Sequence, residues 1–241
     1  MGDFDRFRAL SFDCYGTLID WETGIRKALD GWRSRSAVDA TPDDLIRWFS
    51  ELETLIEQEG APALLYPEVL AETLRRIGAR CGAVVTEEEA AAFGASVRDW
   101  PAFPDSAGAL SRLKQRFRLI IVSNVDRSSF AASNALLGVE FDRIITAEEV
   151  GAYKPSPPHF EALFASLPSL GVERSELAHV AQSLFHDHEP AARYGLPSVW
   201  IDRRHHHDGF GATPAPTVDS IRPGWTYPTL AAFADAVDAV G

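Results

Sequence analysis

The stretch LSFDCYGTLIDW, residues 10–21, decides the fold. Apolar residues run together before Asp13 and do not alternate with polar ones, which is typical of a strand buried on both faces of a parallel sheet. Gly16 marks a tight turn directly after this strand. In open parallel sheets, ligands bind beyond the carboxyl ends of the strands. The stretch therefore predicts that Asp13 lies at the edge of the sheet where a site would form.

Four further apolar runs extend the pattern along the chain: residues 118–124 (RLIIVSN), 142–149 (DRIITAEE), 177–183 (LAHVAQS) and 198–203 (SVWIDR). Between these runs, apolar residues recur every three or four positions, as on one face of a helix. The helical segments are residues 105–117, 128–138, 157–171 and 188–195. Strands that alternate with helices in this way predict an α/β fold, a parallel sheet with helices on both faces.

Residues 23–97 interrupt this alternation, because they contain no convincing strand. Four segments there have helical spacing instead: residues 24–35, 41–60, 66–82 and 86–100. Thr41 stands before Pro42, and Asp44 follows three residues later, which marks a helix start. Helices inserted directly after the first strand fit a cap that covers the site; packing against a sheet edge is the alternative.

Composition limits the partners of the chain. The 241 residues carry a net charge of −12, which argues against a nucleic-acid surface, and no basic tract is available for anionic lipid. A small anionic substrate stays possible, because a pocket can be locally positive. The two cysteines are too few for a disulfide framework. With no signal peptide and no apolar run of membrane-spanning length, we expect reduced thiols and a cytoplasmic protein without membrane contact.

Polar residues follow each predicted strand at the point where a site would form. Alone, each has an ordinary explanation as a turn residue, a helix cap or a solvated lysine. Together they bring carboxylates, hydroxyls, amides and an ammonium group to one sheet edge from distant parts of the chain. These residues are Asp13, Thr17, Ser123, Asn124, Lys154, Gln182, Ser183 and Asp187.

The order of these residues resembles the haloacid dehalogenase superfamily, and most closely its 2-haloacid dehalogenase branch. The resemblance is carried by DCYGT at 13–17, SN at 123–124, KP at 154–155 and the acidic loop that ends at Asp187. It implies a Rossmann-like three-layer core formed by residues 1–20 and 99–241, with a helical cap domain at residues 21–98. It also implies that Asp13 forms a covalent ester with the substrate.

Tyr15 favours one chemistry within this superfamily. Its phosphatases carry a second aspartate at this position, which protonates the leaving alcohol. A phenol with a pKa near 10 is a poor proton donor at neutral pH, whereas a halide ion leaves without a proton. We therefore expect a hydrolase that needs no cofactor and converts short 2-haloalkanoic acids, small anionic substrates, into 2-hydroxyacids.

The resemblance also suggests roles for the other polar residues. Lys154 would hold Asp13 ionised, and Asp187 would position or deprotonate the hydrolytic water. Carboxylates would be held by Thr17, Ser123 and Asn124, beside an apolar wall of Tyr15 and Trp21. The family's fourth loop has Ser-x-Asn, where this chain has Gln182 and Ser183. The family also uses a cap arginine for the substrate carboxylate, and among Arg26, Arg33 and Arg47 we expect Arg47.

Two alternatives remain open from the sequence. A magnesium-dependent phosphohydrolase of the same superfamily would hold Mg²⁺ through Asp13, the backbone carbonyl of Tyr15 and Asp187. A non-catalytic member would bind a small acid or a partner protein. A homodimer formed through the cap or a sheet edge is common in such folds. We interpret the run His205-His206-His207 as a surface loop.

Overall fold

The computed structural model describes residues 4–59, 64–209, 211–218 and 221–239. Its centre is a sheet of six parallel strands in the order β3-β2-β1-β4-β5-β6. Five of these strands confirm the predicted ones, and β1 lies between β2 and β4. The strands are β1 (Ala9–Phe12), β2 (Arg118–Ser123), β3 (Arg143–Thr146), β4 (Leu177–Ala181), β5 (Ser198–Ile201) and β6 (Trp225–Tyr227).

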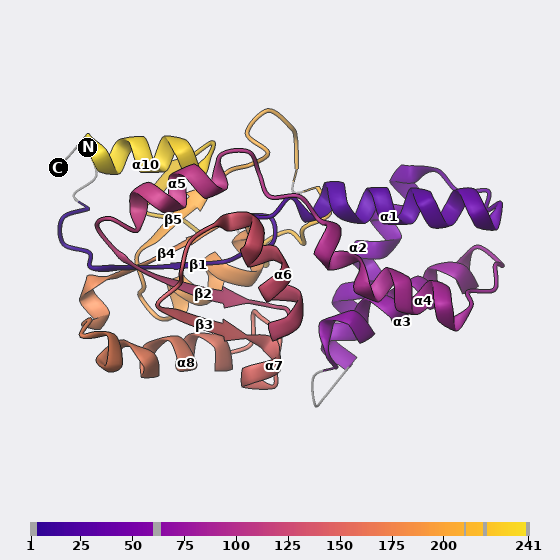
Figure 1. The fold of residues 1–241 in the computed structure, drawn as a ribbon, viewed down its shortest axis with the longest axis horizontal. Coiled ribbons are helices and arrows are strands. Elements are labelled where there is room, and N and C mark those ends of the chain that lie inside the picture. Colours follow the sequence, from indigo (N-terminus) through magenta and orange to yellow (C-terminus); the bar gives the residue numbers. More distant parts are fainter. Residues whose placement is uncertain (1–3, 60–63, 210, 219–220, 240–241) are drawn as a thin grey trace.

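Helices cover both faces of this sheet, as predicted (Figure 1). One face packs against a cluster that includes Leu10, Phe12 and Phe130, to which α5, α6 and α10 contribute. The other face packs through Ala9, Ile120 and residues of α8 and α9. These helices are α5 (Ser106–Leu113), α6 (Arg127–Leu137), α8 (Pro158–Ser166), α9 (Glu189–Arg193) and α10 (Leu230–Asp238), and a short α7 (Ala147–Val150) follows β3. The core therefore has the three layers of a Rossmann-like fold.

The insert forms a separate group of helices beyond the carboxyl ends of the strands (Figure 1). It consists of α1 (Trp21–Ser36), α2 (Pro42–Glu59), α3 (Tyr66–Arg80) and α4 (Glu87–Gly94), followed by a 3-10 turn, Ala95–Asp99. Its helices pack mainly on one another, α2 against α3 and α3 against α4. The insert is thus a helical cap over the strand ends and not a layer against a sheet edge.

The two connections between cap and sheet run side by side. The amide of Asp20 donates to the carbonyl of Pro101 at 2.8 Å, and the amide of Phe103 donates to the carbonyl of Leu18 at 3.0 Å. Both links lie next to the turn that carries Gly16. A motion of the cap would therefore move the end of β1 directly.

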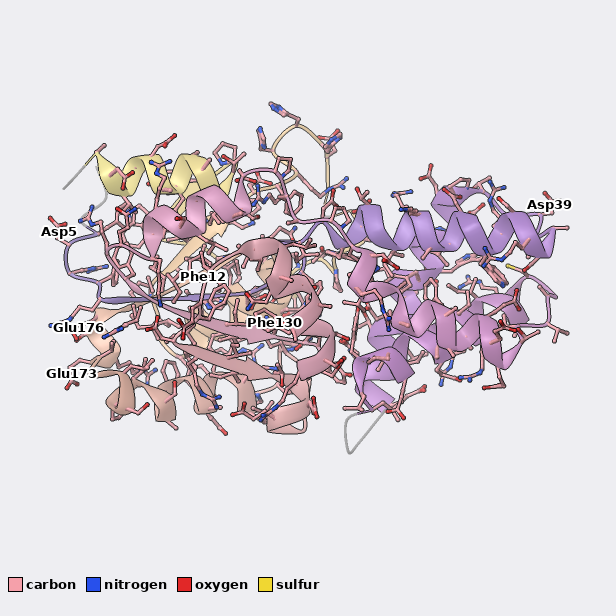
Figure 2. All side chains as sticks on the ribbon, viewed as in Figure 1. Asp5, Phe12, Asp39, Phe130, Glu173 and Glu176 are labelled. Atoms are coloured by element: carbon pink, nitrogen blue, oxygen red, sulfur yellow. The ribbon has the colours of Figure 1, made fainter. Side chains whose placement is uncertain are left out.

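Side chains fill the space between the layers (Figure 2). Phe12 and Phe130 lie inside the core, and Asp39 lies at the far end of the cap (Figure 2). The two cysteines are unbridged, with Cys14 buried and Cys81 partly exposed. Across the part of the chain that the structure describes, every helix is too short or too polar to cross a bilayer.

Candidate active site

Asp13 follows directly after β1 and is held by the turn that comes next. The residue is 6% exposed, and its Oδ2 accepts a hydrogen bond of 2.7 Å from the Thr17 hydroxyl. The turn needs Gly16, whose φ of +96° is in the region that residues with a Cβ rarely adopt. A Cβ there would also lie 3.1 Å from Nε1 of Trp21. The sequence of this turn thus fixes one oxygen of Asp13.

Lys154 binds the other oxygen of Asp13 from the loop after α7. Its Nζ donates to Asp13 Oδ1 at 2.9 Å, to Asp187 Oδ1 at 2.7 Å and to the carbonyl of Val122 at 2.9 Å. An ammonium group has three protons, so these contacts use all of them. The loop is itself held by Asn124, whose Oδ1 accepts from the Lys154 amide at 2.6 Å.

The buried charges stabilise one another. Burial lowers the pKa of Lys154, but Asp13 and Asp187 outweigh it and raise that pKa to about 12. Burial raises the pKa of the Asp13 carboxyl, and the Lys154 ammonium opposes this rise. Against the effect of burial, Lys154 and His179 hold the pKa of Asp187 well below its ordinary value. Lys154 therefore stays charged throughout the neutral range and favours ionised carboxylates on both sides.

His179 supports Asp187 from inside the sheet. Its Nε2 lies 3.0 Å from Asp187 Oδ1, and its Nδ1 lies 2.9 Å from the Ser11 hydroxyl. His179 was not predicted as a site residue, because it lies within the apolar run of β4 and looks there like part of the strand. A polar residue in an otherwise apolar buried strand was the available signal.

The predicted site residues are mostly brought together around one cavity. Asp13, Lys154 and Asp187 lie at its floor, and the predicted residues that also line it are Tyr15, Trp21, Asn124, Gln182 and Ser183. Thr17 lies behind Asp13 and also accepts from the Gln182 amide at 2.9 Å, which ties the fourth-strand loop to the first. Their catalytic roles remain predictions.

Three predicted ligand-binding side chains are placed differently. Ser123 is fully buried and does not line the cavity, and within the described residues its hydroxyl has no hydrogen-bond partner. Asn124 lines the cavity but uses its amide on the backbone of Lys154. Arg47 lies outside the cavity; its side chain is 55% exposed and pairs with Asp44 at 2.6 Å. The expectation for Arg47 is therefore corrected: on α2 it faces solvent, where acidic neighbours one turn away bind it.

Helix α2 instead turns a different face to the cavity. Glu53 and Glu57 line it, together with Tyr66 from α3. Val125, His186 and a segment after β5, residues 212–214, complete the lining. The two glutamates were not predicted as site residues, since acidic residues on a charged amphipathic helix look like a solvated face.

Tyr15 does not point its hydroxyl at Asp13. The phenol oxygen lies 2.8 Å from the Ser133 hydroxyl, and the ring packs edge-on against Trp100. Burial raises the pKa of Tyr15 well above its ordinary value. The phenol is thus a poor acid that is already engaged elsewhere, which leaves no acid two residues after Asp13.

The variant Tyr15→Phe is expected to keep the kcat of the expected hydrolysis at Asp13 within a few-fold of wild type. The variant loses one buried hydrogen bond, so the free energy of unfolding should fall by about 1 kcal/mol. Steady-state kinetics and urea unfolding measure both quantities, with Ser133→Ala as the matched control that breaks the same bond. A fall in kcat of about 100-fold in Tyr15→Phe alone would assign proton transfer to the phenol.

The two carboxylates that a magnesium ion would need are bridged by the Lys154 ammonium. Asp13 uses both carboxylate oxygens on Lys154 and Thr17, and Asp187 Oδ1 accepts from Lys154 and His179. Within the described ranges, no group of three or more His, Cys, Asp or Glu side chains could hold a metal. His205, His206 and His207 are exposed, as predicted for a surface loop.

The chain is similar to known proteins over most of its length. The family model of haloacid dehalogenase-like hydrolases matches residues 7–192. An (S)-2-haloacid dehalogenase from Pseudomonas sp. (strain YL) is 26% identical over 90% of this chain and 93% of its own. The (S)-2-haloacid dehalogenase 4A from Burkholderia cepacia is 28% identical over 83% of this chain and 85% of its own.

A solved structure agrees with the fold. The L-2-haloacid dehalogenase from Xanthobacter autotrophicus superposes with a TM-score of 0.77, covering 98% of this chain and 100% of that one. Its sequence is 19% identical, so this likeness speaks for the fold alone.

Proposed function

The chain belongs to the haloacid dehalogenase-like hydrolases, and from that premise we propose that it releases halide from short 2-haloalkanoic acids or their close derivatives through a covalent ester on Asp13. One observation carries the proposal. A buried carboxylate lines the cavity and is held by Lys154 and Thr17, and the residue two positions further, Tyr15, is too weak an acid to protonate a leaving alcohol. Halide is a leaving group that needs no such proton.

The reaction has two steps. An oxygen of Asp13 attacks the carbon that bears the halogen, the carbon–halogen bond breaks with its electron pair leaving on the halide, and an ester forms. Water then attacks the carboxyl carbon of Asp13, and the ester bond to that carbon breaks. The product carries a hydroxyl group in place of the halogen, and Asp13 is regenerated.

The remaining residues serve these steps. Lys154 orients Asp13 and keeps it ionised through a charge-assisted hydrogen bond. Tyr15 and Trp21 shield the carboxylate from bulk water, which favours attack on carbon. Asp187 and His186, which both line the cavity, are the groups that we propose as acceptors of the proton of the hydrolytic water. Asp187 is charged, and burial lowers the pKa of His186 to about 4, so its imidazole is neutral at pH 7.

Halide release from chloroacetate and chloroacetamide, measured with and without EDTA, tests the proposal. We expect release in many turnovers, unchanged by EDTA or by added Mg²⁺, because halide leaves without a proton and the Lys154 ammonium already supplies the positive charge beside Asp13. Release that stops with EDTA and returns with Mg²⁺ would favour the phosphohydrolase alternative. No release from either compound, with phosphate release from p-nitrophenyl phosphate, would refute the proposal.

A further inference from the structure

The cap presents two carboxyl groups to the catalytic floor. Glu53 and Glu57 are one turn apart on α2, so they share one face of the helix. Both are partly buried, and both line the cavity that contains Asp13 and Lys154. A substrate that reacts with Asp13 therefore shares this cavity with the two carboxyl groups of α2.

Among the described residues, no free cation faces these two groups. Lys154 is the only Lys or Arg among the described residues that line the cavity, and its three protons are used by Asp13, Asp187 and Val122. Glu53 accepts a hydrogen bond of 2.6 Å from the Tyr66 hydroxyl. Glu57 has no hydrogen bond or ion pair with any residue that the structure describes. Within the described residues, these two carboxyl groups thus have no free cation beside them that would pair with a substrate carboxylate.

The charge of a polar group on the substrate determines whether it can bind beside Glu53 and Glu57. A substrate carboxylate at this position binds only while Glu53 and Glu57 keep their protons, because ionised carboxylates in a partly dry cavity repel strongly. An N–H group would instead donate to carboxylate oxygens, which only accept when ionised. A carboxamide carries an NH₂ group where the carboxylic acid carries O⁻, and it keeps the carbonyl next to the reacting carbon.

We propose that the substrate of Asp13 carries a neutral N–H donor, such as a primary amide, where a 2-haloacid carries its carboxylate, and that Glu53 and Glu57 receive it. The inference rests on the proposed release of halide by Asp13. It departs from the expectation of an anionic substrate, whose carboxylate was to be held by Thr17, Ser123 and Asn124 and by a cap arginine.

The pKa values of Glu53 and Glu57 agree with the absence of a donor that would bind them both. Burial raises the pKa of Glu53 to about 7, although the Tyr66 hydroxyl opposes the rise. Burial and then the charge of Glu53 raise the pKa of Glu57 well above its ordinary value, while Lys154 lowers it. Two carboxyl groups that resist ionisation together are in an environment that lacks a donor, and an N–H group would supply one.

The test compares chloroacetamide with chloroacetate, which differ only in NH₂ against O⁻. At pH 8, where Glu53 is mostly ionised, we expect wild-type kcat/KM to favour chloroacetamide by about 10-fold or more. In the double variant E53Q/E57Q this preference should shrink about 10-fold, with a lower KM for chloroacetate because the charge of Glu53 is gone. Glu51→Gln is the matched control on α2, since Glu51 is half exposed and pairs with Arg80 outside the cavity.

The outcomes separate the two proposals. Halide release that favours chloroacetate in wild type, with a preference unchanged in E53Q/E57Q, would overturn this inference and leave the release of halide by Asp13 intact. No release beyond one equivalent per cysteine from either compound would overturn the proposed function. Cys81→Ser measures the halide that thiol alkylation contributes, because Cys81 is the more exposed cysteine.

Discussion

Asp13→Asn should abolish turnover while leaving the fold intact. The amide is nearly the same shape as the carboxylate and still accepts the Thr17 hydroxyl or the Lys154 ammonium, but it is not a nucleophile toward carbon. Loss of a nucleophile removes most of the rate enhancement, so we expect kcat to fall by about 10⁴-fold or more. Halide release under saturating substrate measures this, and circular dichroism checks that the variant is folded.

One artefact must be separated from a true residual rate. An asparagine next to Lys154 and water can deamidate to aspartate, so activity that grows with storage would reflect regenerated wild type. Mass spectrometry of the peptide that contains position 13 detects the change of one mass unit. Full activity in protein that is shown to be undeamidated would end the proposal that Asp13 is the nucleophile.

Lys154→Met should lower both activity and stability. The methionine fills a similar volume but leaves the carboxylates of Asp13 and Asp187 buried without their cation. Removing one partner of a buried ion pair costs about 3–5 kcal/mol. Urea unfolding at pH 7 measures the loss. Lys114→Met is the matched control, since Lys114 pairs with Asp142 near the surface and its loss should cost about 1 kcal/mol or less.

The pH dependence of Lys154→Met distinguishes an electrostatic loss from simple mispacking. In wild type the pKa of Asp187 is lowered on folding, so its contribution to stability is present above the unfolded pKa and is lost as the pH falls. Without Lys154 the buried carboxylates have raised pKa values, and the folded state binds more protons than the unfolded one. The variant should therefore lose stability as the pH rises from 5 to 8, and a loss independent of pH would contradict this account.

The sequence predicts the core well because local patterns determine it. The apolar run before Asp13 could only be buried on both faces, and it forms the central strand β1. Thr41 and Pro42 predicted a helix start, and α2 begins at Pro42 with the Thr41 hydroxyl accepting from the Asp44 amide. Strand β6 was missed, since it has three partly exposed residues at the sheet edge and no apolar run.

The cap face of the site was less predictable. Asp13, Lys154 and Asp187 could be placed because parallel strands bring their carboxyl ends to one edge. Which face of α2 covers that edge depends on how the cap helices pack, and helical spacing alone does not give this. Arg47 and Glu53 lie on the same helix, and the structure turns Glu53 toward the cavity and Arg47 toward solvent.

The covalent ester is tested most directly by oxygen tracing. An excess of enzyme is given less than one equivalent of the better chlorinated substrate in ¹⁸O water, and the peptide that contains Asp13 is analysed by mass spectrometry. Because water attacks the carboxyl carbon, we expect the ¹⁸O in Asp13 and unlabelled oxygen in the product hydroxyl. Label in the product after a single turnover, with none in Asp13, would show that water attacks the substrate directly and would contradict the account.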